Sequence, residues 1–493
     1  MQVSTVLEVS VRPSIPEDAD LAMDYIDENS SLYTTMTTDV IKKVDRSIIP
    51  IVSCLMSVKM MEKSITSYGS ILGLREDLRM TQETYTWVSS IFYFGYLIFE
   101  FPISLIIQKA LSKSLSTSVL VWGVLLLCHA SCQTSNGFLT CRFFIGMFES
   151  AMSPAYTLIT SQWWKREEQF TRCSMWFGFQ GFGTILQAGV AYVLLIHDSQ
   201  LALASWRLLY IMTGILTMIF GFLSAFYIPE NPLKAHFFNA IEKMDFIQRL
   251  RSNHQGVGNK TFKQSQLFEA FTDTVSYIMF AHGIFYSIGS SSFSNFGSMI
   301  LMNDFGYSSK ASILLGMVGG ALDISLPTIV AYMNEKLFTG KKLIICSLAS
   351  TITLIGMIVF KYANDRILRL FGYFSFYVST IVISGVISNI ASNVAGHTKK
   401  IIVSALFHMG TAVGSIIGPQ FFKNNDYEQA KTALLITSII GTFDILMLIT
   451  IYTYRNSERE KLRISYGPKY IAPEFIELFD LTDMENPEFR YLL

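Results

Sequence analysis

The stretch Ala240–Gln266, AIEKMDFIQRLRSNHQGVGNKTFKQSQ, is a polar segment in the middle of a chain of 493 residues that is otherwise rich in apolar runs. Hydrophobic residues make up 51% of the chain and charged residues only 15%, whereas about 25% of the residues in a soluble domain are charged. This composition indicates a membrane protein with several spans. The net charge of zero gives nucleic-acid binding no electrostatic support.

Apolar runs of about twenty residues, the length that crosses a bilayer as a helix, recur on both sides of this segment and predict an all-α membrane protein. The loop 229–271 separates six such runs from six more. We expect a cytosolic N-terminal tail at 1–47, six-helix halves at 48–228 and 272–454, a cytosolic central loop at 229–271 and a cytosolic C-terminal tail at 455–493. The twelve predicted spans are 48–68, 85–107, 117–133, 138–160, 172–195, 207–228, 273–293, 309–332, 343–361, 368–390, 401–421 and 432–454.

The distribution of Lys and Arg predicts the orientation. Most of these residues lie on the side that holds both termini and the loop 229–271, and cytosolic loops are the ones enriched in positive charge. We therefore expect cytosolic termini in a plasma-membrane protein, with the endoplasmic reticulum or another internal membrane as the alternative. Apolar residues within the loop predict a short amphipathic helix on the inner face. The six cysteines are scattered without metal-binding spacing.

Charged residues within the predicted spans are the candidates for function, because a charge at the bilayer centre costs about 2.5–3.5 kcal/mol unless it is paired or hydrated. The first span contains MSVKMMEKSI, with Lys59, Glu62 and Lys63, and the fourth contains CRFFIGMFESAMSP, with Arg142 and Glu149. The last two are seven residues apart, so they share a helix face about 10 Å apart along the axis. Both groups join a cation with a carboxylate, which suits anion binding and proton transfer but is also compatible with structural ion pairs.

Three further charged residues have less defined roles. Lys59, nearer the inner half, can pack against Glu62, and its role is open. Glu100, just before Pro102, is expected to form a gating contact or a structural salt bridge. Asp323 is in the middle of a span in the second half, and its role is open.

Six ordered motifs resemble the anion:cation symporter family of the major facilitator superfamily, and within it the fungal allantoate permease branch. The resemblance runs from about residue 44 to the C-terminus and implies a major facilitator fold of two six-helix halves. The motifs are YTWVSSIFYFGYLIFEFP at Tyr85–Pro102, RFFIGMFES at Arg142–Ser150, WWKREEQFTR at Trp163–Arg172, NVAGHTKK at Asn393–Lys400, GSIIGPQFF at Gly414–Phe422 and FDLTDMENPEFRYLL at Phe479–Leu493.

The resemblance also implies roles for individual residues. An acidic–basic pair on the first helix of the family lines the central cavity, and here Glu62 and Lys63 take its place. The family pattern implies that Lys63 and Arg142 hold a substrate carboxylate and that Glu62 and Glu149 handle protons. Three more side chains are implied as polar substrate contacts: Tyr96, Gln180 and His408.

Two features depart from the family pattern. Lys63 replaces the commoner Arg, so a point charge stands where a bidentate group is frequent. The turn Gln108–Ser116 has neither the Asp nor the Gly of the family's gating loop, so we expect its gating contacts to be altered.

We therefore predict a monomeric, proton-coupled permease that takes up a small organic anion, such as a carboxylate, vitamin, dipeptide or sulfur compound, by alternating access. Its predicted partners are the anion, protons and the lipid bilayer, with no nucleic acid, cofactor or metal. An uncoupled facilitator or exchanger of the same fold is the first alternative, and a nutrient sensor that does not transport is the second. An enzyme is disfavoured because no nucleophile–base set or metal cluster is present in the sequence.

Overall fold

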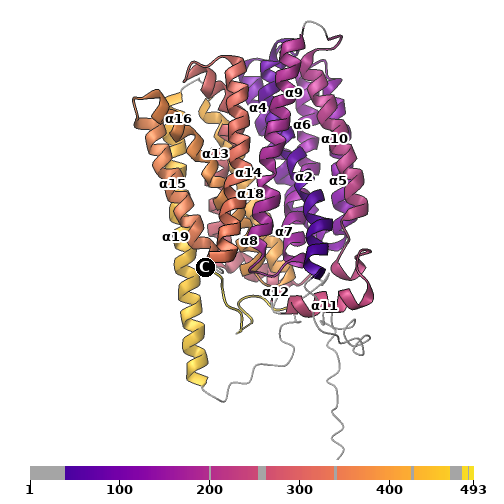
Figure 1. Ribbon diagram of the computed structural model, residues 1–493, viewed down its shortest axis with the longest axis vertical. Helices are drawn as coiled ribbons and strands as arrows, with labels where there is room; N and C mark the ends of the chain where they lie inside the picture. Colours follow the sequence, from indigo (N-terminus) through magenta and orange to yellow (C-terminus); the bar gives the residue numbers. More distant parts are fainter. Residues whose placement is uncertain are drawn as a thin grey trace, which may run out of the picture.

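The computed structural model describes residues 39–198, 201–251, 253, 262–337, 341–422, 427–466, 480–486 and 488–493. Most of the expected N-terminal tail, and parts of the central loop and C-terminal tail, lie outside these residues. The described chain is a bundle of long helices (Figure 1). Its helices are α2 Asp39–Ile71, α3 Leu74–Asp77, α4 Gln82–Lys109, α5 Leu111–Ala130, α6 Ser135–Glu149, α7 Met152–Trp163, α8 Gln169–Gly178, α9 Gln180–His197, α10 Ser205–Tyr227, η3 Pro232–Lys234, α11 Ala240–Arg251, α12 Gln264–Thr272, α13 Thr274–Asn303, α14 Ser309–Leu337, α15 Lys342–Tyr362, α16 Arg366–Ser375, η4 Phe376–Val378, α17 Ser379–Asn393, α18 His397–Ile417, η5 Gly418–Phe422 and α19 Tyr427–Tyr466.

The twelve predicted spans are all present, six before the central loop and six after it, as the expected fold of two six-helix halves requires. Several spans are built from two consecutive helices: α6 with α7, α8 with α9, and α16 with α17 through η4. The predicted ends are less accurate than the spans. Helix α2 begins nine residues before residue 48, at Asp39, and α19 continues to Tyr466, because amphipathic or charged helical turns extend beyond the apolar run.

Nine helical segments among the described residues have the length and hydropathy of a membrane span. The three spans that fall short of this measure are α2, the α6–α7 pair and α13. Helices α2 and α6–α7 carry the charges discussed above, and α13 is rich in Ser and Gly. These three polar spans all contribute to the cavity described below, so their low hydropathy reflects a position inside the bundle.

Close helix contacts through glycine hold the bundle together. In the first half, a Cβ atom on Gly146 of α6 would clash with the backbone carbonyl of Phe92 on α4. Between the halves, a Cβ atom on Gly181 of α9 would clash with the carbonyl of Gly320 on α14. Small residues that let backbones approach this closely are typical of helix packing in membranes.

One end of the bundle holds the start of α2, the helices α11 and α12 and the C-terminal residues (Figure 1); we call it the tail end and the opposite one the far end. The predicted amphipathic helix of the central loop is confirmed as α11. Phe246 of α11 is buried against Trp163 with ring centroids 5.5 Å apart, whereas Ile241 is exposed. Lys43 of α2 and Glu242 of α11 form a 2.8 Å ion pair, so α11 is attached to the first half.

The turn between α4 and α5, which lacks the family's acidic residue, receives a carboxylate from elsewhere in the chain. Glu230, after the end of α10, accepts hydrogen bonds from the backbone N–H groups of Ser112 and Lys113, both at 3.3 Å. A carboxylate at a helix N-terminus is stabilised by the free N–H groups and by the helix dipole. The turn is thus bound by a carboxylate from its own half of the molecule.

Candidate functional site

A cavity of about 170 Å³ lies between the two halves. Its wall is formed by α2, α4, α6, α7, α8 and α9 from the first half and by α13, α14, α16, η4, α17 and α18 from the second. Helices α2, α13 and α18 run from the tail end to the far end. Their lining residues lie in the C-terminal part of each helix, at 56–68 on α2, 286–301 on α13 and 407–415 on α18. The cavity therefore lies from the middle of the bundle toward the far end.

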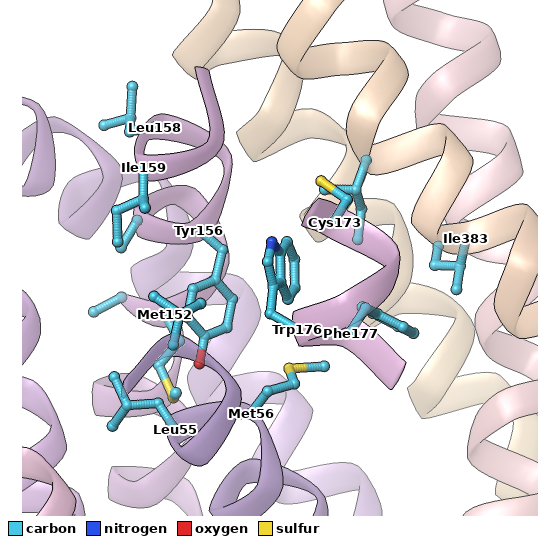
Figure 2. Packing of buried hydrophobic residues seen from close by; sticks show 14 of the residues in the cluster. Leu55, Met56, Met152, Tyr156, Leu158, Ile159, Cys173, Trp176, Phe177 and Ile383 are labelled. Carbon is cyan, nitrogen blue, oxygen red and sulfur yellow. The ribbon is translucent and has the colours of Figure 1, made fainter. Parts of the chain in front are cut away.

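Aromatic side chains form the part of the cavity wall nearest the tail end, where α7 and α8 pack against each other (Figure 2). Tyr156 of α7 faces Trp176 of α8, with ring centroids 4.9 Å apart. Met56 and Phe177 lie beside them, and Ile383 of α17 lines the cavity from the second half; we call these five residues the floor. The floor separates the cavity from the tail end with a layer of apolar side chains.

Arg142 and Glu62 form a buried ion pair behind the cavity wall. Both side chains are almost fully buried, at 3% and 1% exposure, and neither lines the cavity. Arg142 also donates hydrogen bonds to Thr66 Oγ1 and, at 3.3 Å, to Tyr210 Oη. The expectation that Glu62 faces the cavity beside Lys63 is therefore wrong for this structure, because Glu62 turns toward Arg142.

A second ion pair lies on the cavity wall itself. Lys59 Nζ is 3.5 Å from Glu149 Oε1 and 3.2 Å from Ser153 Oγ, to which Tyr96 Oη donates at 2.7 Å. All four side chains line the cavity. Lys59, whose role the sequence left open, does not pair with Glu62, because Glu62 is bound by Arg142 and Lys59 reaches across to α6.

The remaining predicted contacts lie on the wall. Lys63 is half-buried and lines the cavity, and no described acidic group lies within ion-pair distance of its Nζ. Gln180 and His408 also line it, from α9 and α18. Of the seven predicted site residues, the structure thus brings Lys63, Tyr96, Glu149, Gln180 and His408 to one cavity and leaves Glu62 and Arg142 behind its wall.

Glu100 and Asp323, whose roles the sequence left open, are both buried. Glu100 is 0% exposed on α4, where Lys59 and Tyr96 are its charged and polar neighbours. Asp323 lines the cavity from α14 at 4% exposure and accepts a 2.5 Å hydrogen bond from Thr380 Oγ1 of α17. The cavity thus carries a carboxylate from each half.

Two features of the wall were missed at the level of sequence, although helix geometry contains them. Lys59 and Lys63 are four residues apart and so share a helix face, whereas Glu62 shares its face with Thr66. That spacing alone separates the cavity cations from the Arg142 partners. Hydroxyl groups also follow one face of α13, at Ser287, Ser290, Ser291, Ser294 and Ser298.

The Major Facilitator Superfamily model matches residues 52–419. Allantoate permease of Saccharomyces cerevisiae is 36% identical, covering 97% of this chain and 91% of that protein. An uncharacterized transporter of Schizosaccharomyces pombe is 34% identical over 100% of this chain and 97% of its own length. The Thiamine pathway transporter of Saccharomyces cerevisiae is 28% identical, with 93% and 87% covered.

Solved structures of the same fold are more distant in sequence. The proton:xylose symporter XylE superposes with a TM-score of 0.66 at 14% identity, covering 84% of this chain and 96% of that chain. The human organic anion transporter MFSD10 superposes with a TM-score of 0.57 at 11% identity, covering 81% and 99%. At this identity, the two superpositions show a shared arrangement of helices only.

Proposed function

Because the chain belongs to the Major Facilitator Superfamily, in the branch that includes yeast allantoate permease, we propose that it is a proton-coupled permease for a small organic anion. The observation that carries the proposal is the cavity between the halves, with Lys63 and the Lys59–Glu149 pair on its wall. Ionisable groups within membrane spans mark substrate and proton pathways, and transporters of this fold place the substrate between the halves at mid-membrane.

Lys63 is the first anion contact in this proposal. It faces the cavity without a described acidic partner, so a substrate carboxylate can supply the missing charge. Tyr96, Gln180 and His408 line the same space and donate hydrogen bonds to the bound anion. Arg142 can reach the substrate only after Glu62 has taken up a proton, because the protonated carboxyl no longer holds the guanidinium. This gives the pair a later role in the transport cycle.

Glu149 couples the proton to the anion through Lys59. The 3.5 Å separation of the two charges is longer than a normal charged hydrogen bond, so the pair is loose. When Glu149 accepts a proton, Lys59 loses its counter-charge and can bind the anion. An anion without the proton would compete with the Glu149 carboxylate for Lys59, so both must enter together.

We assign the tail end to the cytosol, because positive residues are enriched there and cytosolic loops carry most Lys and Arg, and we assign the chain to the plasma membrane as a monomer. We also propose six-helix halves at 48–228 and 272–454, joined by a cytosolic central loop at 229–271 and flanked by cytosolic tails at 1–47 and 455–493. The cavity then faces the outside, and the aromatic floor blocks the cytosolic path. Rocking of the halves about the site moves the floor and delivers anion and proton inward.

The test is uptake of labelled allantoate, nicotinate and a dipeptide into cells whose medium is made more acidic than the cytosol. We expect accumulation that collapses with a protonophore and is lost in Glu149→Gln. The control Glu458→Gln changes an exposed carboxylate beyond the bundle and should transport normally. Accumulation that survives the protonophore would instead identify an uncoupled facilitator or exchanger, and intact pH-driven uptake by Glu149→Gln would exclude the proton role of Glu149.

A further inference from the structure

Glu100 of α4 is a buried carboxylate that the proposed coupling scheme does not use. Its side chain is fully buried and does not line the cavity. Neither of its oxygens has a hydrogen-bond partner among the described residues, and no described cation lies within ion-pair distance of them. An ionised carboxylate at this place in a membrane would lack both a counter-charge and hydration, which is unfavourable. The protonated, neutral form avoids this cost.

Lys59 interacts with two carboxylates, Glu100 and the cavity carboxylate Glu149. Its Nζ lies 3.5 Å from Glu149 Oε1, and its charge also acts on Glu100. Tyr96 is a neighbour of all three side chains. The Tyr96 ring lies 5.9 Å from Lys59 Nζ, and the Tyr96 hydroxyl donates to Ser153 at 2.7 Å. In this structure the lysine pairs with Glu149 and leaves Glu100 without a counter-charge.

Glu100 lies nearer the tail end than Glu149. Helices α4 and α6–α7 both run from the far end toward the tail end, so later residues on them are closer to the tail end. Tyr96 bonds to Ser153, which follows Glu149 by four residues, and Glu100 follows Tyr96 by four more. Each of these intervals is about 6 Å of helix rise. Glu149 is thus on the far-end side of the Tyr96–Ser153 hydrogen bond, and Glu100 is on its tail-end side.

We propose that Glu100 is the carboxylate from which the transported proton leaves toward the cytosol, and that Lys59 pairs with Glu149 and Glu100 in turn. This relay rests on the proposed function and names the route of the proton through the same site. With Lys59 on ionised Glu149, as in this structure, Glu100 holds a proton. One lysine, two carboxylates and one proton together carry no net charge, which suits a group buried in a membrane.

The steps of the relay balance in protons and in charge for a monovalent anion. A proton from outside binds Glu149, and the entering anion takes the place of Glu149 at Lys59. When the anion has left on the cytosolic side, Lys59 turns to Glu100, whose proton is released to the cytosol. The proton on Glu149 then passes to Glu100 while Lys59 returns to Glu149. Each cycle moves one proton and one anion inward, and the site is neutral at every stage.

The experiment separates net transport from exchange in proteoliposomes. Net uptake is measured with the medium more acidic than the lumen, and exchange is measured at equal pH with unlabelled compound inside. The probe is whichever of labelled allantoate, nicotinate and dipeptide the wild type accumulates. Glu100→Gln keeps the size of the protonated side chain but releases no proton. We expect net uptake to fall by about tenfold or more, because the group that positions the departing proton is lost. Exchange, which needs no proton release, should stay near the wild-type rate.

Thermal unfolding at neutral pH tests the protonation of Glu100 separately. Because a protonated carboxyl and an amide are alike in size and charge, Glu100→Gln should change the melting temperature little. Glu149→Gln removes the charged partner of buried Lys59 and should lower it. The exposed change Glu458→Gln is the control in all three assays. A shift by Glu100→Gln as large as that by Glu149→Gln, in either direction, would show that Glu100 is ionised and would overturn the relay.

The transport assays contradict the relay in two further ways. Unchanged net uptake in Glu100→Gln would leave Glu149 as the sole proton site, and equal losses of net uptake and exchange would make Glu100 a structural residue. If Glu100→Gln does not fold, Glu100→Asp keeps a titratable carboxyl and should show both activities, and loss of both would again indicate a structural role. Accumulation by wild type that survives a protonophore would refute the proposed function itself, which no result with Glu100→Gln can do.

A second inference rests on a different set of contacts, those of the C-terminal residues Asp480–Leu493. Most of these contacts attach the segment to the second half. Lys399 of α18 is fully buried and forms ion pairs with Asp483, at 2.8 Å, and with Glu269 and Asp273. The segment is therefore an integral part of the tail end, and we call it the C-terminal strap.

The strap also reaches the first half through Arg166, in the turn between α7 and α8. Arg166 Nη2 donates to the Arg490 carbonyl at 2.7 Å, and its guanidinium lies 4.1 Å from the centroid of the Phe489 ring. The same side chain donates to the Ser392 carbonyl of α17 at 2.6 Å. One arginine of the first half is thus bound by the second half and by the strap together. These contacts must break before the halves can separate at the tail end.

We infer that the C-terminal strap holds the tail end closed and stabilises the state in which the cavity lies toward the far end. The experiment labels Ser298→Cys, on the far-end part of the cavity wall, with a membrane-impermeant maleimide in a background without the native cysteines. We expect Arg166→Ala or Phe489→Ala to slow labelling several-fold, because the population moves to the state open at the tail end. Lys461→Met, an exposed change on α19, is the control. Unchanged or faster labelling in both strap variants would overturn the inference, and unfolding would give faster labelling.

Discussion

Lys59 Nζ lies 3.5 Å from Glu149 Oε1, and both side chains line the cavity between the halves. The other buried pair of the first half, Arg142 with Glu62, has no contact with the cavity. The two pairs therefore differ in what can reach them. An incoming anion can compete for Lys59 directly, whereas Arg142 is screened by its partners. This difference leads to separate predictions for the two pairs.

Lys59 and Glu149 should act as one unit in transport. We expect Lys59→Met to lose pH-driven accumulation to the same extent as Glu149→Gln, and the double variant to be no worse than either single one. The reason is that residues sharing one interaction show strongly non-additive effects. Initial uptake rates at two outside pH values measure this. Losses that add in the double variant would show that the residues act separately.

Besides its proposed later role in the cycle, the Arg142–Glu62 pair should contribute to the stability of the folded protein. Removing one member of a buried ion pair leaves an uncompensated charge and costs about 3–5 kcal/mol, so Glu62→Gln and Arg142→Met should each lower the melting temperature of the protein in detergent. The double variant Arg142→Met with Glu62→Gln should recover most of this loss. Thermal unfolding of the four proteins is the measurement, and a double variant that melts below both single ones would contradict the pairing.

The sequence predicted the fold well because fold-level signals are local. Apolar runs of membrane length and the basic loop 229–271 depend only on neighbouring residues, and all twelve spans appear in the structure. Pairing within the site was predicted less well. Glu62 has a cation next to it in sequence, Lys63, yet its partner is Arg142, eighty residues away. Which of two cations a carboxylate meets depends on the rotation of α2 against α6, and spacing along one helix limits that rotation only partly.

Asp323 shows why the rest could not be predicted. Its neighbours Gln180 and Thr380 come from helices on both sides of the boundary between the halves. They meet because Gly181 and Gly320 allow α9 and α14 to approach closely. A single sequence contains these glycines, but it does not show which helices they bring together.

Gly146 and Gly189 provide a matched test of helix contact. A Cβ atom on Gly146 would clash with the Phe92 carbonyl, whereas one on Gly189 would meet nothing within 4 Å. Alanine favours a helix by up to about 1 kcal/mol over glycine, so Gly189→Ala should be neutral or slightly stabilising. Gly146→Ala should be destabilising by about 1–3 kcal/mol through overpacking. Melting temperatures in detergent decide this, and equal effects of the two changes would contradict the close approach of α4 and α6.

Asp273, which caps α13 at the tail end, should show a defined pH dependence. Burial alone would raise the pKa of this carboxyl, but Lys399 and Arg455 hold it below its usual value. A lowered folded-state pKa means that the stabilisation is complete above the unfolded value of about 3.9 and is lost as pH falls through the folded pKa. Asp273→Asn should therefore lower the melting temperature by a constant amount between pH 6 and 8. A difference that changes within that window would contradict the assignment.

Lys63 should determine anion affinity more than stability, because it faces the cavity without a described acidic partner. Lys63→Met removes the charge and nearly keeps the chain length, so we expect the affinity for the transported anion, measured as the concentration of labelled anion that half-saturates uptake, to weaken by about tenfold or more, in keeping with the free energy of a hydrogen bond to a charged group. Melting temperature without ligand should change little, since no buried carboxylate loses its partner. Lys63→Arg should keep most of the affinity, and the exposed Lys461→Met should match wild type. Unchanged affinity in Lys63→Met would transfer the anion contact to Lys59, which is the other lysine on the described wall.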